Sequence, residues 1–107
     1  MTLERWQDLV ATILDRFAVS DRGQQALEEG PGTREYIEFA SPAGDIRLEF
    51  TTRPVVIGKK TFGGRKVGTA TGVKYEYSQT ETSHQFSAWR KVDGQWQEVD
   101  PQTFASV

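Results

Sequence analysis

The sequence predicts an α+β fold, in which an N-terminal amphipathic helix packs on a curved antiparallel meander of about six strands. An apolar repeat with steps of three and four residues near the N-terminus indicates the helix. A change to a two-residue repeat from Thr33 onward indicates the strands, and turn signals rich in glycine, proline and aspartate separate them. At 107 residues the chain has the size of one domain, so we expect residues 1–107 to share a single core.

The first element is expected to be a helix from residue 3 to residue 18. Its apolar side chains recur on one helical face and charged residues lie between them, which is the pattern of a helix with one buried side. Thr2 precedes the repeat and is the predicted N-cap. The apolar positions are Leu3, Trp6, Leu9, Val10, Ile13, Leu14 and Phe17.

Residues 19–33 are predicted to be a linker. Gly23, Gly30, Pro31 and Gly32 fall within this stretch, and glycine and proline disfavour a regular helix interior. We therefore expect no more than one helical turn here.

The antiparallel sheet is expected to occupy residues 34–100 as three successive hairpins. The first turn is predicted at Ser41–Gly44, and Pro54 is expected to end the strand that follows it. The second hairpin is predicted to turn at Gly63-Gly64. The third is predicted at Asp93-Gly94, because an Asp-Gly pair between alternating segments is a strong hairpin signal.

The width of this sheet places a constraint on the fold. Six strands at a spacing of about 4.8 Å are roughly 24 Å across, whereas a helix is only about 10 Å thick. We therefore expect the sheet to curl around the helix, or to bury its remaining surface against another copy or a partner. Residues 101–107 are predicted to form a short tail.

The charges of the chain are segregated. Residues 50–75 contain six cationic residues and no acidic one, although the whole chain has a net charge of −2 and fifteen acidic residues. A local concentration of positive charge in an acidic protein indicates contact with an anionic partner. The cationic residues are Arg53, Lys59, Lys60, Arg65, Lys66 and Lys74.

A two-residue turn at Gly63-Gly64 would place Phe62 opposite Arg65 at the hairpin tip, with Lys59, Lys60 and Lys66 close behind. A basic ribbon with an apolar tip is of the same physical type as the β-arms that enter a nucleic-acid groove. The alternative is that these charges only solubilise the hairpin and protect its edges from aggregation. Acidic proteins and lipid headgroups are further anionic partners that this charge would suit.

The third hairpin brings two tryptophans to one face. With a turn at Asp93-Gly94, Trp89 lies opposite Glu98 and Lys91 lies opposite Trp96, so the two indoles are diagonal neighbours. The other face is more aliphatic and is the predicted core side. Trp89 and Trp96 are therefore candidates for protein contact, base stacking or sugar stacking. The alternative is that the tail covers them or that they form the core.

The composition excludes several chemistries. The chain has no cysteine, so it forms neither disulfides nor thiolate metal sites. His84 is the only histidine and is expected to be an ordinary strand residue, because a zinc site would need further ligands. The glycines at 58 and 63 have a phosphate-loop separation, but Gly64-Arg65-Lys66 follows instead of lysine and serine or threonine. We expect no cofactor, no metal and no enzymatic activity.

The sequence is therefore interpreted as a small non-enzymatic binding or accessory module. The expected partner is anionic, namely DNA, RNA or an acidic protein, and the contact surface is the basic hairpin with Arg53, Lys74 and the two tryptophans. The alternative is a protein-interaction or homo-oligomeric module, such as a homodimer, that uses the sheet face left uncovered by the helix. A cytoplasmic location without membrane contact is expected, because no signal peptide or apolar span is present.

Overall fold

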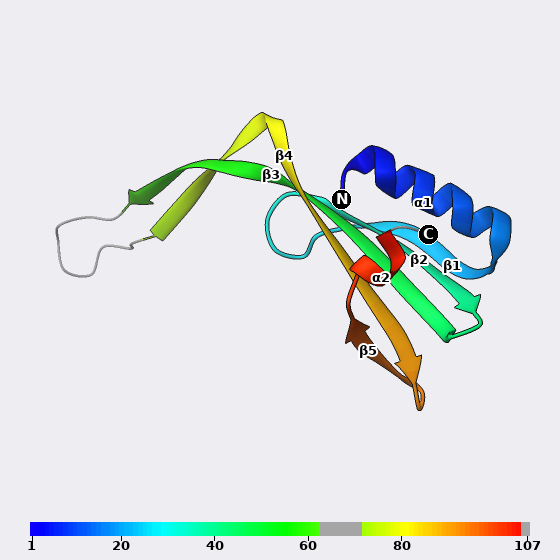
Figure 1. Cartoon of the computed structure of the whole chain (residues 1–107). Coiled ribbons are helices and arrows are strands. Elements are labelled where there is room, and N and C mark those ends of the chain that lie inside the picture. Colours follow the sequence, from blue (N-terminus) through cyan, green and yellow to red (C-terminus); the bar gives the residue numbers. More distant parts are fainter. Residues whose placement is uncertain (63–71, 106–107) are drawn as a thin grey trace.

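The computed structural model describes residues 1–62 and 72–105, with side chains for residues 1–58 and 76–104. It confirms the α+β class. Within these described ranges, two helices and five strands follow one another (Figure 1). They are α1 (Leu3–Arg16), β1 (Ala18–Ala26), β2 (Thr33–Ser41), β3 (Gly44–Phe62), β4 (Gly72–Val92), β5 (Gln95–Val99) and α2 (Gln102–Ala105).

The strands form one antiparallel sheet in the order β1-β2-β3-β4-β5, so each strand pairs with the next one in sequence. The sheet has five strands and not about six. Pro54 does not end a strand, because β3 continues through it to Phe62. The pairing of β2 with β3 ends at Thr33 and Thr52, so Pro54 lies beyond β2, where its missing N–H breaks no bond to that strand.

The predicted linker at residues 19–33 is also wrong, because β1 occupies its first half. This strand lies at the edge of the sheet and is mostly exposed, so it lacks the apolar alternation that would reveal it in the sequence. The turn to β2 is closed by the Leu27 N–H, which donates to the Gly32 carbonyl at 3.2 Å.

The start of α1 follows the prediction, and its end comes two residues earlier than expected. The Thr2 Oγ1 accepts the Arg5 backbone N–H at 3.2 Å, as an N-cap should. Phe17 is already extended, with φ −128° and ψ 157°, and its N–H donates to the Ile13 carbonyl. The chain therefore turns from helix into β1 without an intervening loop.

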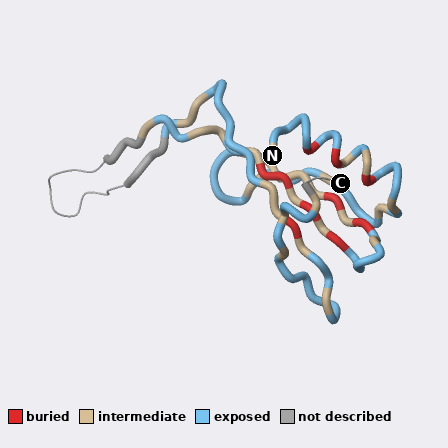
Figure 2. Tube along the Cα trace, in the orientation of Figure 1, coloured by how far each residue is buried: buried red, intermediate tan, exposed pale blue. Residues whose placement is uncertain are grey.

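The buried core lies between α1 and one face of the sheet (Figure 2). The Trp6 indole is 1% exposed and stacks on Phe50 of β3, and its Nε1–H donates to the Glu35 carboxylate. Phe104 of α2 packs against the same core. Among the described side chains, the buried apolar residues are Trp6, Leu9, Ile13, Ile37, Phe39, Ile46, Leu48, Phe50 and Ala88.

The strands β3 and β4 extend well beyond the rest of the sheet. Past Arg53 they pair only with each other, and Figure 1 shows them leaving the body as a two-stranded ribbon. We call residues 54–62 and 72–82 the arm. Two register shifts mark its base, between Pro54 and Val56 and between Val56 and Gly58.

At the first shift the extra residues lie in β4, and at the second shift the extra residue lies in β3. Thr82 pairs with Pro54, but Tyr77 is already the partner of Val56, so the intervening residues of β4 bulge out of the ladder. Within this bulge the Ser78 Oγ accepts the backbone N–H of Glu81 at 2.9 Å. The bulge therefore re-aims the arm away from the body, as Figure 1 shows.

The predicted two-residue turn at Gly63-Gly64 is wrong. Phe62 pairs with Gly72 and not with Arg65, and Lys59 pairs with Tyr75. The register is fixed in the core, where Leu48 opposes Ala88, and the bulges shift it by too little to bring β3 and β4 together at the two glycines. Residues 63–71, which include Arg65 and Lys66, lie outside the described residues, as do the side chains of Lys59, Lys60, Phe62 and Lys74.

Candidate binding groove on the uncovered sheet face

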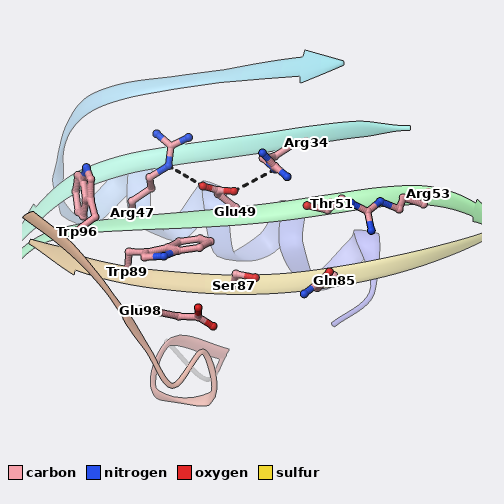
Figure 3. A pocket seen from close by; sticks show the side chains of 10 residues that line it. All are labelled: Arg34, Arg47, Glu49, Thr51, Arg53, Gln85, Ser87, Trp89, Trp96 and Glu98. Carbon is pink, nitrogen blue, oxygen red and sulfur yellow. Dashed lines mark hydrogen bonds and ion pairs between the residues drawn. The ribbon is translucent and has the colours of Figure 1, made fainter. Parts of the chain in front are cut away.

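The face of the sheet opposite α1 carries a shallow hollow of about 500 Å³, which we call the groove. Its β3 side chains are those that alternate with the buried Ile46, Leu48 and Phe50, so the pleat of the strand directs them away from the core. Figure 3 shows the lining side chains in front of the sheet and the helix behind it. The lining residues are Arg34, Arg47, Glu49, Thr51, Arg53, Gln85, Ser87, Trp89, Trp96 and Glu98.

Arg47 is the centre of a charge network in the groove. Its Nε donates to Glu49 Oε2 at 2.8 Å and its Nη1 donates to Glu38 Oε2 at 2.7 Å. The guanidinium also lies 4.3 Å from the centre of the Tyr36 ring. Burial lowers the pKa of Arg47, but Glu49 and Glu38 outweigh this effect and raise the pKa overall. The charge of Arg47 is therefore neutralised within the protein.

Arg34 makes a weaker contact with the same carboxylate. Its Nε lies 3.1 Å from Glu49 Oε1, an ion pair that Figure 3 draws beside the Arg47 contact. The Nε–H is not aligned for a hydrogen bond, and this buried nitrogen has no hydrogen-bond partner among the described residues. Glu49 is thus shared between two arginines, and the two positive charges of Arg34 and Arg47 are balanced by Glu38 and Glu49.

Arg53 lies where the sheet becomes the arm. Its side chain is exposed and has no ion pair within the part of the chain that the structure describes, while its backbone carbonyl accepts the Ser83 hydroxyl at 3.4 Å. Arg53 lines the groove and also two neighbouring hollows. This guanidinium is available to an anion from outside.

The two tryptophans lie at the other end of the groove (Figure 3). The predicted register is confirmed, since Trp89 pairs with Glu98 and Lys91 with Trp96. The two-residue turn is also confirmed, with φ values of 51° at Asp93 and 79° at Gly94. Trp96 is 36% exposed, and Trp89 is half-buried.

The alternatives for the tryptophans do not hold. The opposite face of β4 carries the buried Ala88, so Trp89 is not on the core side. Phe104 of the tail packs against the core, on the side of the sheet away from the groove. One face of Trp96 is approached by Lys91, whose Nζ lies 5.6 Å from the ring centre.

The structure thus brings Arg53, Trp89 and Trp96 along one groove, and leaves the remaining predicted site residues outside the described side chains. Sequence reasoning missed Arg34, Arg47, Glu49, Gln85 and Ser87. The two-residue repeat of β3 puts Arg47 and Glu49 on the same face, but their convergence with residues of β2 and β4 depends on which strands pair and in which register.

His84 lies on the core side of the sheet, at its edge. Its ring stacks on Phe50, with centroids 5.0 Å apart, and its Nδ1 and Nε2 lie 3.1 and 3.4 Å from the Thr52 and Thr82 hydroxyls. Among the residues described, no cluster of histidine, aspartate or glutamate has the arrangement of a metal site. His84 therefore packs and hydrogen-bonds as a strand residue.

The chain was compared with known proteins in three ways. No protein-family model matches it, and neither a curated protein nor a solved structure shows significant similarity. Within the described ranges, neither helix is long and apolar enough to cross a membrane.

Proposed function

We propose that this protein is a small non-enzymatic binding module that contacts an anionic partner, nucleic acid, through the arm and the groove that leads to it. The observation that carries the proposal is the position of Arg53. This exposed guanidinium, without an ion pair among the described residues, lines the groove and immediately precedes the arm. An anion bound there could contact both surfaces.

The sequence and backbone of the arm support this proposal. Residues 50–75 contain no acidic residue, so no carboxylate within that stretch opposes a polyanion. The ladder places Lys60 and Lys74 at directly opposed positions, and like charges there are unfavourable unless an anion offsets them. A two-stranded ribbon also fits the major groove of duplex DNA, which is about 12 Å wide.

The experiment is a binding titration with labelled DNA and RNA at low salt. Lys59, Lys60, Arg65 and Lys66 are replaced together by glutamine, which we expect to lower the affinity by at least about 100-fold. The matched control replaces Arg5, Arg16, Arg22 and Arg90, which changes the net charge equally outside the arm and should have a much smaller effect. Equal losses in the two variants would show that net charge, and not the arm, attracts the nucleic acid.

A second candidate is a protein-interaction or homo-oligomeric module. It is favoured by large apolar side chains at the surface, since Val56 and Ile57 of the arm are 52% and 64% exposed and Trp96 also faces solvent. Sedimentation equilibrium tests the homo-oligomeric form directly. A dimer that dissociates when Ile57 and Trp96 are replaced by serine would support it, and a strict monomer at high concentration would exclude it.

A further inference from the structure

We propose that the groove holds a single strand of nucleic acid, with bases on Trp89 and Trp96 and a phosphate on Arg53. This inference rests on the proposed function and adds the form of the ligand and its orientation. The two ends of the groove differ in chemistry, because aromatic rings lie at one end and an arginine without an ion pair among the described residues lies at the other. A polymer that alternates planar rings and anions matches both ends.

The aromatic end suits unpaired bases. Trp89 and Trp96 are diagonal neighbours on adjacent strands. Residues at such diagonal positions are roughly 7–8 Å apart. Two successive bases of an extended strand can therefore each meet one indole. A duplex keeps its base faces stacked inside, so stacking on the indoles requires a single strand.

The remaining length of the groove suits a backbone that runs along the strands. Trp89 lies opposite Arg47, and Arg53 is six positions farther along β3, or about 20 Å away. Thr51, Gln85 and Ser87 line the intervening floor and offer hydrogen-bond donors and acceptors to base edges or sugars. The ligand is thus several nucleotides long.

Charge favours this occupant over a neutral or cationic one. Arg47 is already neutralised by Glu38 and Glu49, whereas Arg53 has no such partner among the described residues. Glu98 opposes an anionic ligand at the tryptophan end. Its charge gives a diagnostic test, because Glu98→Gln should strengthen the binding of a polyanion and leave the binding of a neutral polymer unchanged.

The experiment uses the full chain and a labelled oligothymidylate of roughly 12 nucleotides, with a duplex of the same length for comparison. Trp89→Ala and Trp96→Ala should each lower single-strand affinity about tenfold and leave duplex affinity unchanged. Trp89→Phe and Trp96→Phe should each retain most of the single-strand affinity, because phenylalanine can still stack on a base. Glu98→Gln should raise single-strand affinity two- to threefold, which is the size of effect expected when one repulsive surface charge is removed. Circular dichroism checks that each variant is folded.

Intrinsic fluorescence gives a second readout. Saturation with oligothymidylate should quench the wild-type emission, and the Trp89→Phe/Trp96→Phe double variant should lose this quenching, because its one remaining indole, Trp6, is buried. Full single-strand affinity in both alanine variants, or unchanged emission at saturation, would overturn the inference. Quenching by polyglutamate or a neutral glucan but not by oligothymidylate would overturn it as well.

The outcomes also separate this inference from the proposed function. If the variant with Lys59, Lys60, Arg65 and Lys66 replaced by glutamine loses binding but the tryptophan variants do not, nucleic-acid binding stands and the role of the groove is wrong. If the wild-type protein binds neither the single strand nor the duplex at low salt, both proposals are wrong.

Discussion

The indole of Trp6 lies almost parallel to the phenyl ring of Phe50, with ring centroids 5.3 Å apart and planes 9° apart. The imidazole of His84 also stacks on Phe50, with ring centroids 5.0 Å apart and an angle of 13° between the ring planes. Offset stacking of this kind adds about 0.5–1.5 kcal/mol beyond the burial of the rings. The helix is thereby tied to the middle of β3, the strand that continues from the core into the groove and the arm.

Replacing Trp6 with alanine should therefore be among the most damaging single changes. We expect the free energy of unfolding to fall by about 3–5 kcal/mol, because a large buried side chain leaves a cavity. Trp96→Ala, at the exposed end of the groove, should cost less than about 1 kcal/mol. Urea denaturation measures both, and equal costs would mean that the helix is not seated on the sheet as described.

The two arginines that share Glu49 should differ in their contribution to stability. Arg47→Gln breaks two hydrogen-bonded ion pairs and should cost about 1.5 kcal/mol or more, whereas Arg34→Gln should cost less than about 1 kcal/mol. Chemical denaturation of the two variants provides the comparison, and a larger loss for Arg34→Gln would contradict the network.

The pH dependence of this network follows from the raised pKa of Arg47. A cation whose pKa is higher in the folded state contributes stability below its unfolded pKa and loses it as the pH rises through the folded pKa. For arginine this window lies at strongly alkaline pH. Between pH 6 and pH 9, wild type and Arg47→Gln should therefore differ in stability by a constant amount, and a marked convergence within that range would count against the assignment.

Two glycines with positive φ should respond differently to alanine. Gly32 has φ +133°, and an added Cβ would lie 2.5 Å from the backbone carbonyl oxygen of Thr52. Gly94 has φ +79° in the last hairpin turn, with no atom within 4 Å of the new Cβ. We expect Gly94→Ala to lower the free energy of unfolding by about 1 kcal/mol and Gly32→Ala to lower it by at least about 2 kcal/mol. Thermal unfolding of the two variants measures the difference. The reverse order would contradict the close approach of the β1–β2 turn to β3.

The arm should contribute little to folding, because the nine apolar core residues found among the described side chains all lie outside it. A variant in which residues 55–81 are replaced by Asn-Gly, between the paired Pro54 and Thr82, should stay folded and lose less than about 1 kcal/mol. Its stability is compared with that of the full chain by chemical denaturation. Unfolding of the shortened chain would mean that the arm supports the core.

Much of the fold is visible in the sequence where burial and periodicity agree. The apolar repeat that includes Trp6 and Ile13 predicts α1, and Asp93-Gly94 predicts the last turn and the register of its strands. The edge strand β1 was missed because it buries too little to need apolar alternation. The prediction that the strand ends at Pro54 was wrong, because a proline interrupts a strand only where a neighbouring strand needs a backbone N–H at that position.

The contacts of the candidate site also fall into those that the sequence predicts and those that it does not. Adjacency of Trp89 and Trp96 follows from one short hairpin, so local sequence is enough to predict it. The meeting of Arg34 with Glu49 depends on the pairing of β2 with β3, and the position of Gln85 depends on β4. Long-range register decides such contacts, and the Gly63-Gly64 prediction failed for the same reason.

The most direct test of the account is the salt dependence of nucleic-acid binding. The logarithm of the association constant, plotted against the logarithm of salt concentration, should fall with a slope of about −3 to −4 if each of the four cations Lys59, Lys60, Arg65 and Lys66 meets one phosphate. The variant with all four replaced by glutamine should show a much shallower slope, close to −1, because Arg53 keeps its phosphate contact. A wild-type protein that binds neither DNA nor RNA at low salt, or whose slope is unchanged in the variant, would contradict the account.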